Sequence, residues 1–150
     1  MQHKHHIVFL TGAGISQESG ISTFRDANGL WNNHKIEEVA SPEGFEKNPQ
    51  LVLDFYNARR RQLDEVNPNE AHHLIAQLET KYNVTVITQN IDDLHERAGS
   101  TNVLHLHGEL RKSRSSKNPN LIYDCNQDIK LGDLASDGNQ LRPHIVWFGE

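Results

Sequence analysis

The 150-residue sequence has a single cysteine, no long apolar run and no excess of basic residues. One cysteine, Cys125, excludes an internal disulfide and suits a reducing compartment, so we expect a cytoplasmic protein. No apolar run approaches the ~20 residues that a membrane-spanning helix requires. The net charge of −5 argues against direct nucleic-acid binding, which normally needs a basic face, and is compatible with a basic peptide partner.

The first informative stretch combines a strand pattern with a glycine turn. Residues 7–10 (IVFL) form a short apolar run that predicts a buried parallel strand. The run ends in 11–14 (TGAG), where glycine permits a sharp turn and a close approach of the backbone to a ligand. Residues 16–19 suit the first turn of a helix, whose free N–H groups favour an anion. Because Gln17 replaces the third glycine of the dinucleotide fingerprint, a plain tight turn remains an alternative to a phosphate site.

An amphipathic helix is predicted over 49–66. Asn48 before Pro49 is a typical helix start, and apolar residues follow at three- and four-residue spacing. Tyr56 and Arg59 lie on one face of this helix, where a phenol and a guanidinium can together bind a carboxylate. From the spacing alone, a packed tyrosine beside an arginine that lies along the surface is the simpler interpretation. Arg60-Arg61 is expected on the solvated face.

Polar side chains follow the next predicted strand. Asn69 is expected to cap a helix over 70–82, and 84–88 (VTVIT) is a β-branched strand pattern. The strand ends in 89–92 (QNID), at the edge where open α/β sheets bind ligands. A short helix over 93–98 should stop at Gly99.

A third strand is predicted over 103–108, with His105 and His107 on one face because side chains alternate along a strand. The pattern alone favours a structural or surface role for His107 in this histidine-rich chain. Residues 109–140 are polar and predict a small lobe of short strands or turns. The apolar run 145–148 predicts a central parallel strand that a further helix would cover, so we expect the native chain to continue.

Four motifs occur in order along the sequence: Gly12-Ala-Gly14-Ile-Ser16 with Ser19-Gly-Ile and Phe24-Arg25, then Thr88-Gln-Asn-Ile-Asp92-Asp-Leu-His95, then His107-Gly108, then Arg142-Pro-His-Ile-Val-Trp-Phe148-Gly-Glu150. This ordered set resembles the sirtuins, which are NAD-dependent protein lysine deacylases, over 7–150. The resemblance implies an α/β fold, a Rossmann-like parallel sheet with helices on both faces and a small inserted lobe. The implied division is 1–35 (start of the Rossmann-like domain with the cofactor loop), 36–68 (helical segment with the acyl-pocket helix), 69–108 (Rossmann-like domain), 109–140 (small lobe) and 141–150 (return strand).

The resemblance also implies roles for individual residues. NAD, consumed as a co-substrate, would be bound by Gly12, Ala13, Gly14, Ser16, Glu18, Phe24, Arg25, Trp31, Gln89, Asn90, Ile91 and Asp92. His107 would be the general base, with Asn90 as a second catalytic residue. The acyl-lysine of a protein or peptide partner would be bound by Tyr56, Arg59, Val146, Phe148 and Gly149.

In the implied reaction the acyl carbonyl oxygen attacks C1′ of the nicotinamide ribose and expels nicotinamide. A histidine then removes a proton from a ribose hydroxyl, which attacks the acyl carbon. The products are free lysine, nicotinamide and O-acyl-ADP-ribose. Residues 55–60 (FYNARR) resemble the branch of the family that removes succinyl and malonyl groups. The alternative is an NAD- or ADP-ribose-binding protein, or an ADP-ribosyltransferase, without deacylase activity.

The small lobe departs from the family pattern. Family members usually carry two Cys-x-x-Cys pairs that bind structural zinc between the positions that match His107 and Arg142. Here that interval contains only Cys125, so four thiolates cannot surround a metal and we expect no zinc. The lobe must then be held by 121–123 (LIY) and its neighbours, or be mobile.

Overall fold

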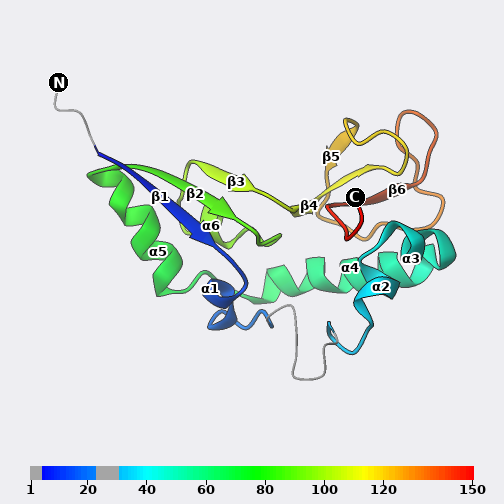
Figure 1. Cartoon of the computed structure of the whole chain (residues 1–150), viewed down its shortest axis with the longest axis horizontal. Coiled ribbons are helices and arrows are strands. Elements are labelled where there is room, and N and C mark those ends of the chain that lie inside the picture. Colours follow the sequence, from blue (N-terminus) through cyan, green and yellow to red (C-terminus); the bar gives the residue numbers. More distant parts are fainter. Residues whose placement is uncertain (1–4, 23–30) are drawn as a thin grey trace.

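Two small sheets lie at opposite ends of one long helix in the computed structural model, which describes residues 5–22 and 31–150 (Figure 1). The elements in chain order are β1 (His6–Thr11), α1 (Gly14–Gln17), α2 (Ile36–Val39), α3 (Pro42–Lys47), α4 (Pro49–Glu65), α5 (Glu70–Gln77), the 3-10 helix η1 (Leu78–Thr80), β2 (Asn83–Thr88), α6 (Leu94–Arg97), β3 (Val103–His105), β4 (Gly108–Ser115), β5 (Ile122–Asp124) and β6 (Leu141–Ile145). One sheet has the order β1-β2-β3 and the other β5-β4-β6. The predicted α/β class with a separate small lobe is confirmed.

The first sheet is parallel, as predicted. β1 pairs with β2, and β2 pairs with β3, so that Thr11, Thr88 and His105 lie side by side at the carboxyl edge. The loops after the first two of these residues contain the glycine turn and the 89–92 segment. The register therefore brings two predicted ligand-binding segments to the same edge of the sheet.

Helices cover one face of the parallel sheet. Val86, on that face, is fully buried, and the rings of His72 in α5 and His95 in α6 meet at a centroid distance of 4.9 Å. The opposite face exposes Val8 and Leu10. Among the described residues, the expectation of helices on both faces therefore holds for one face only. None of the described helices has the length and apolar character needed to cross a bilayer.

Predicted caps account for the helix boundaries. The Asn48 side chain accepts a hydrogen bond from the Leu51 N–H at 3.2 Å, and α4 begins at the predicted Pro49. Asn69 forms a capping box at the start of α5, in which His72 supplies the returning acceptor. Gly99 has a φ of 107° and follows the end of α6. The helix predicted over 70–82 is shorter than expected, because α5 ends at Gln77 and a 3-10 helix continues to Thr80. The helix after the glycine turn, α1, has four residues.

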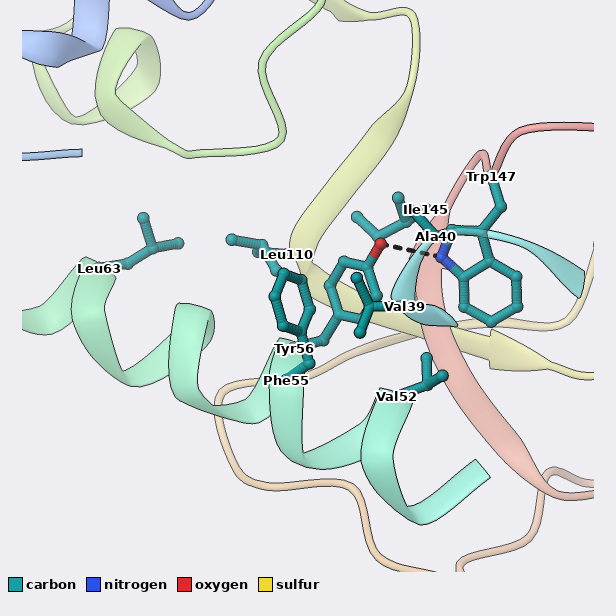
Figure 2. Close-up of a cluster of buried hydrophobic side chains, with 9 residues drawn as sticks. All are labelled: Val39, Ala40, Val52, Phe55, Tyr56, Leu63, Leu110, Ile145 and Trp147. Atoms are coloured by element: carbon teal, nitrogen blue, oxygen red, sulfur yellow. Dashed lines mark hydrogen bonds between the residues drawn. The ribbon is translucent and has the colours of Figure 1, made fainter. Parts of the chain in front are cut away.

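A second core lies between α4 and the antiparallel sheet, on the right of Figure 1 and enlarged in Figure 2. Its buried members are Val39, Ala40, Val52, Phe55, Tyr56, Leu63, Leu110, Ile145 and Trp147. They come from four segments far apart in the sequence. The helical segment and the small sheet therefore share one core, although the predicted domain division itself stays a prediction.

The central parallel strand expected over 145–148 is wrong. β6 ends at Ile145 and pairs antiparallel with β4 in the small sheet. Beyond it Trp147 is buried, whereas Val146 and Phe148 are about half exposed. A short apolar run does not distinguish a buried strand from a segment that packs one side chain and presents the next to a cavity.

The strand predicted over 103–108 is also wrong in extent, because β3 ends at His105 and β4 begins at Gly108. At Gly108 a Cβ atom would lie 2.0 Å from the carbonyl oxygen of His144, and φ is 85°. Only glycine fits this crossing of β4 and β6. The short strands or turns predicted over 109–140 include β4, which is eight residues long and has serines such as Ser113 and Ser115 at buried positions in place of apolar residues.

Polar contacts from α4 hold the small lobe. Arg60, expected in solvent, is 1% exposed and donates hydrogen bonds to the carbonyl oxygens of Leu110 and Gln127. Asn57 bonds both the N–H and the C=O of Ile129, each at 2.9 Å. Ile122, expected to hold the lobe, is 44% exposed, whereas Ile129 is 3% exposed. Because the lobe has few apolar residues, these hydrogen bonds between side chains of α4 and the backbone of the lobe replace part of a hydrophobic core.

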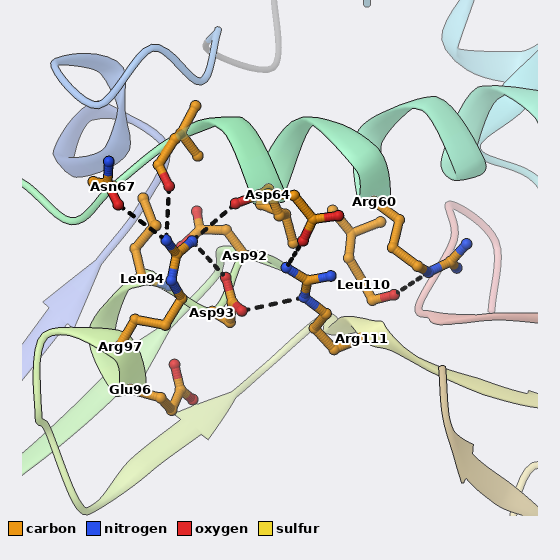
Figure 3. Close-up of polar contacts among 12 residues, drawn as sticks. Arg60, Asp64, Asn67, Asp92, Asp93, Leu94, Glu96, Arg97, Leu110 and Arg111 are labelled. Carbon is orange, nitrogen blue, oxygen red and sulfur yellow. Dashed lines mark hydrogen bonds and ion pairs between the residues drawn. The ribbon is translucent and has the colours of Figure 1, made fainter. Parts of the chain in front are cut away.

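Ion pairs fix α6 and the start of β4 against α4. Figure 3 shows Arg111 between Asp64 of α4 and Asp93, which immediately precedes α6. The N···O distances are 2.7 Å to Asp64 and 3.2 Å to Asp93. Arg97 of α6 donates to the carbonyl oxygen of Leu63 at 2.9 Å. These contacts set where the 89–92 segment lies relative to α4.

Candidate active site

A buried polar cluster joins the glycine turn to the end of β2. The Ser16 hydroxyl donates to Asp92 at 2.9 Å, and the Asn90 amide donates to Ser16 Oγ and to the Gly12 carbonyl oxygen, both at 3.1 Å. Ser16, Asn90 and Asp92 are each less than 10% exposed. Because every member is held by another, the cluster is ordered before any ligand arrives.

Burial raises the pKa of the Asp92 carboxyl above its usual range, although hydrogen bonds from Ser16 and from the Leu94 N–H oppose the rise. No cation forms an ion pair with Asp92 among the described residues. A buried carboxylate of this kind can accept a hydrogen bond from an amide N–H of a ligand.

Space around the turn suits a close approach of a ligand. A Cβ atom added at Gly14 would meet nothing within 4 Å, and one at Gly12 would make only ordinary contact with Gln89. Neither glycine has a positive φ. Neither backbone conformation nor a close contact in the described structure therefore requires glycine at 14, and the space beside the backbone is open to a ligand.

His107 lies in the turn between β3 and β4, at the rim of this cluster. Its Nδ1 lies 3.1 Å from the Gln89 carbonyl oxygen, which can only accept. Nδ1 therefore carries a hydrogen, which leaves Nε2 as the nitrogen that can accept a proton. The His107 carbonyl oxygen accepts from the Val146 N–H at 2.9 Å, which ties the histidine to the segment after β6.

Tyr56 of α4 and Trp147, which follows β6, contact each other in a second part of the site. The Trp147 indole N–H donates to the Tyr56 hydroxyl at 3.0 Å, the dashed line in Figure 2. The guanidinium of Arg142 stacks on the indole, 3.3 Å from the ring centroid, and pairs with Glu150 at 2.6 Å. The contacts fix the position of Trp147, and through it the Tyr56 hydroxyl.

Arg59 lies on the same side of α4, half-buried over the Phe55 ring at 4.2 Å from its centroid. Its Nη1 donates to the Phe55 carbonyl oxygen at 3.1 Å. Burial lowers the pKa of the guanidinium, and the nearby Tyr56 opposes that shift. These contacts to Phe55 hold the side chain in place, and Arg59 lines a cavity.

One cavity of about 480 Å³ joins these regions. The residues proposed from the sequence that line it are Ala13, Ser16, Trp31, Tyr56, Arg59, Gln89, Asn90, Ile91, Asp92, His107, Val146 and Phe148. Gly12, Gly14, Glu18 and Gly149 do not line it, and Phe24 and Arg25 lie outside the described residues. The structure thus places residues predicted to bind the nucleotide and residues predicted to bind the acyl group around one cavity.

Further lining residues were missed from the sequence, among them Asn32, Leu110 and Trp147. Trp147 belongs to the motif that ends at Glu150. It lies between Val146 and Phe148, both predicted to bind substrate, and this position could have indicated that it lines the same cavity. Asn32 has a φ of 48°, and adjacent asparagines are typical of a tight turn with positive φ. The sequence contains no comparable signal for Leu110.

Fold and site together define an α/β protein with a cavity at the carboxyl edge of a parallel sheet, lined mainly by apolar side chains and by a few polar ones such as Asn90 and Asp92. The model of the Sir2 family matches residues 12–150. The chain is also 67% identical over 145 residues to an NAD-dependent protein deacylase of Helicobacter pylori, an alignment that covers 97% of this chain. The chain therefore belongs to the Sir2 family.

Two solved structures have the same fold. A Sir2 homolog in complex with NAD gives a TM-score of 0.83 at 45% identity, over 99% of this chain and 59% of that one. A mutant Sir2 homologue in complex with 2′-O-acetyl ADP-ribose gives 0.84 at 44% identity, over 98% and 60%. The chain spans 63% of the length of the Helicobacter pylori relative, less than two thirds.

Proposed function

We propose that this chain catalyses the NAD-dependent removal of acyl groups from protein lysine, with succinyl and malonyl groups as substrates in addition to acetyl. The single cavity shared by His107, Asn90 and Asp92 at one end and by Tyr56 and Arg59 at the other supports this proposal. The names of the relatives, an NAD-dependent protein deacylase and a homolog bound to NAD, agree with it.

The nucleotide end provides the groups that the first step needs. Asn90 and Asp92 would hold the nicotinamide, with the buried Asp92 carboxyl accepting a hydrogen bond from the carboxamide N–H. The open space at Gly14 fits the pyrophosphate. A leaving group held in this way leaves C1′ of the ribose exposed to the acyl carbonyl oxygen, which is a positioning effect.

His107 would act in the second step. Its Nε2 lone pair is free because Nδ1–H is directed at the Gln89 carbonyl oxygen. It would remove the proton from a ribose hydroxyl, whose oxygen then attacks the acyl carbon. The hydrogen bond that the Val146 N–H donates to the His107 carbonyl oxygen keeps this base beside the segment that would bind the acyl-lysine.

The acidic acyl preference depends on Tyr56 and Arg59. Tyr56 and Arg59 lie one helical turn apart in α4, and both residues line the cavity. An arginine can donate two parallel N–H bonds to a carboxylate, and the phenol can add a third. An acetyl group has no carboxylate, so only succinyl and malonyl groups would use these donors.

The zinc of other family members would be absent from this chain. In the described residues no group of three or more histidine, cysteine, aspartate or glutamate side chains is arranged to hold a metal ion. Instead of a metal ion, the hydrogen bonds from Asn57 and Arg60 would hold the lobe. Elemental analysis should find zinc far below one atom per chain, and stoichiometric zinc would contradict this part of the proposal.

Product analysis tests the activity. The chain is incubated with NAD and a peptide that carries succinyl-lysine, and the mixture is analysed by mass spectrometry. Equal amounts of nicotinamide, free lysine peptide and O-succinyl-ADP-ribose support deacylation. ADP-ribose attached to protein with the acyl group retained would indicate an ADP-ribosyltransferase, and bound NAD without any product would indicate a binding protein.

A further inference from the structure

Arg59 is already occupied by a side chain of the same protein. Because a guanidinium can only donate, the Asn32 amide turns its oxygen toward Arg59 and accepts from Nη2 at 2.7 Å and from Nε at 3.0 Å. The amide nitrogen of Asn32 then donates to Ser22 Oγ at 3.1 Å. One oxygen thus receives both N–H groups on the side edge of the guanidinium.

That side edge is one of the two that can bind a carboxylate through parallel hydrogen bonds. The other N–H groups are less available, because Nη1 donates to the Phe55 carbonyl oxygen and the guanidinium stacks on the Phe55 ring. Asn32 and Arg59 both line the cavity. A carboxylate that enters this region therefore meets the Asn32 amide at the edge that it would use.

The turn around Asn32 holds the amide in that position. Trp31 and His34 pair across it, and Asn32 and Asn33 have φ values of 48° and 67°. Trp31 packs edge-on against Phe55, at 4.8 Å between centroids. The turn is anchored to α4 beside the arginine that it covers, so the contact between Asn32 and Arg59 is a built feature of the cavity.

We propose that Asn32 is a specificity-determining residue, because its amide oxygen occupies the edge of Arg59 that the carboxylate of an acidic acyl group must take. The inference rests on the proposed function of Arg59. Succinyl- and malonyl-lysine bind by replacing the neutral amide oxygen of Asn32 with a carboxylate, whose negative charge binds the guanidinium more strongly than a neutral acceptor does. Acetyl-lysine leaves the contact intact. Asn32 therefore lowers the preference for acidic acyl groups below what Tyr56 and Arg59 alone would give.

Two substitutions at position 32 test the proposal in opposite directions. Asn32→Asp places a carboxylate permanently on Arg59, and Asn32→Gly removes the competitor while keeping the positive φ. Asn33→Asp and Asn33→Gly are matched controls, since Asn33 is exposed, has the same backbone conformation and does not line the cavity. The readouts are kcat/KM and peptide Kd, measured with succinyl-lysine and acetyl-lysine peptides.

We expect Asn32→Asp to lower the succinyl-to-acetyl ratio of kcat/KM, and that of the association constant 1/Kd, by about tenfold or more, and Asn32→Gly to raise both ratios about threefold. The Asn33 variants should leave the ratio at the wild-type value. A lower ratio in Asn32→Gly, or equal effects of Asn32→Asp and Asn33→Asp, would overturn the proposal.

Arg59→Met distinguishes a failure of the inference about Asn32 from a failure of the proposed acyl specificity. If the wild type prefers succinyl-lysine and Arg59→Met removes that preference while the Asn32 variants change nothing, the inference about Asn32 alone fails. If the wild type has no preference and Arg59→Met affects both peptides equally, the proposed acyl specificity fails and the inference fails with it.

Discussion

The indole N–H of Trp147 donates to the hydroxyl oxygen of Tyr56 at 3.0 Å, and both side chains are buried. An indole nitrogen can only donate, so the hydroxyl hydrogen of Tyr56 must point away from Trp147. Burial raises the pKa of Tyr56 well above its usual value, and the hydroxyl therefore keeps its hydrogen throughout the physiological range. Trp147 thus orients a phenol that remains a donor toward the cavity.

This relationship predicts an effect of Trp147→Phe on acyl selectivity. Without the indole N–H the Tyr56 hydroxyl is free to turn, so the succinyl-to-acetyl ratio of kcat/KM should fall by about threefold to tenfold. Tyr56→Phe should lower the ratio by a similar amount, and the double substitution should add little. Additive losses in the double variant would show that Trp147 does not act through Tyr56.

Arg59→Met tests the carboxylate contact directly. Methionine keeps much of the apolar stem over Phe55 but cannot donate hydrogen bonds, so the succinyl-to-acetyl ratio of kcat/KM should fall about tenfold or more. Steady-state kinetics on matched peptides measures it. Equal losses on the two peptides would remove the carboxylate-binding role of Arg59.

Asn57→Leu should destabilise the small lobe. Leucine branches at the same position but leaves the N–H and C=O of Ile129 without partners in a buried position, so the free energy of unfolding should fall by about 3 kcal/mol. Urea denaturation measures the change. Asn120→Leu on the exposed surface is the control and should cost no more than about 0.5 kcal/mol. Similar values for the two variants would contradict the role of Asn57 in holding the lobe.

The His105–Glu96 pair predicts a dependence of stability on pH. Burial alone would lower the pKa of His105, but hydrogen bonds to Glu96 at 2.7 Å and to the Asn90 carbonyl oxygen at 2.8 Å raise it above its usual value. Because the folded state holds the proton more tightly, this contribution is complete below a pH of about 6.5 and is lost as pH rises through the folded pKa.

The matched variant for this prediction is Glu96→Gln, which removes the charge that favours the imidazolium. The difference in unfolding free energy between wild type and variant should be largest near pH 6 and should shrink toward pH 9. Urea titrations at several pH values measure it. A difference that stays constant over this range would mean that Glu96 does not raise the pKa of His105.

Local rules predicted the elements with strong capping or turn signals. Asn48, Asn69 and Gly99 mark boundaries that the structure has, because each acts on its own helix end through one side chain or one φ angle. The order of the motifs likewise led to the residues that line the cavity. The roles assigned to those residues stay predictions.

Long-range partners could not be read from the sequence. Arg60 is buried because carbonyl groups at Leu110 and Gln127, 50 and 67 residues away, meet its guanidinium. The run 145–148 has the composition of a strand, but the Gly108 crossing sends β6 into the antiparallel sheet. Nothing in the turn 31–34 indicates that Asn32 faces Arg59, since that contact depends on how the turn packs on α4.

The central claim, that His107 is the base of a second step between NAD-derived ribose and an acyl-lysine, is tested most directly by His107→Ala with labelled nicotinamide. Nicotinamide leaves before His107 is needed, so the variant should still exchange labelled nicotinamide into NAD in the presence of acyl-peptide. Its formation of O-acyl-ADP-ribose should fall by about 100-fold or more. Formation of O-acyl-ADP-ribose at the wild-type rate by His107→Ala would contradict the account.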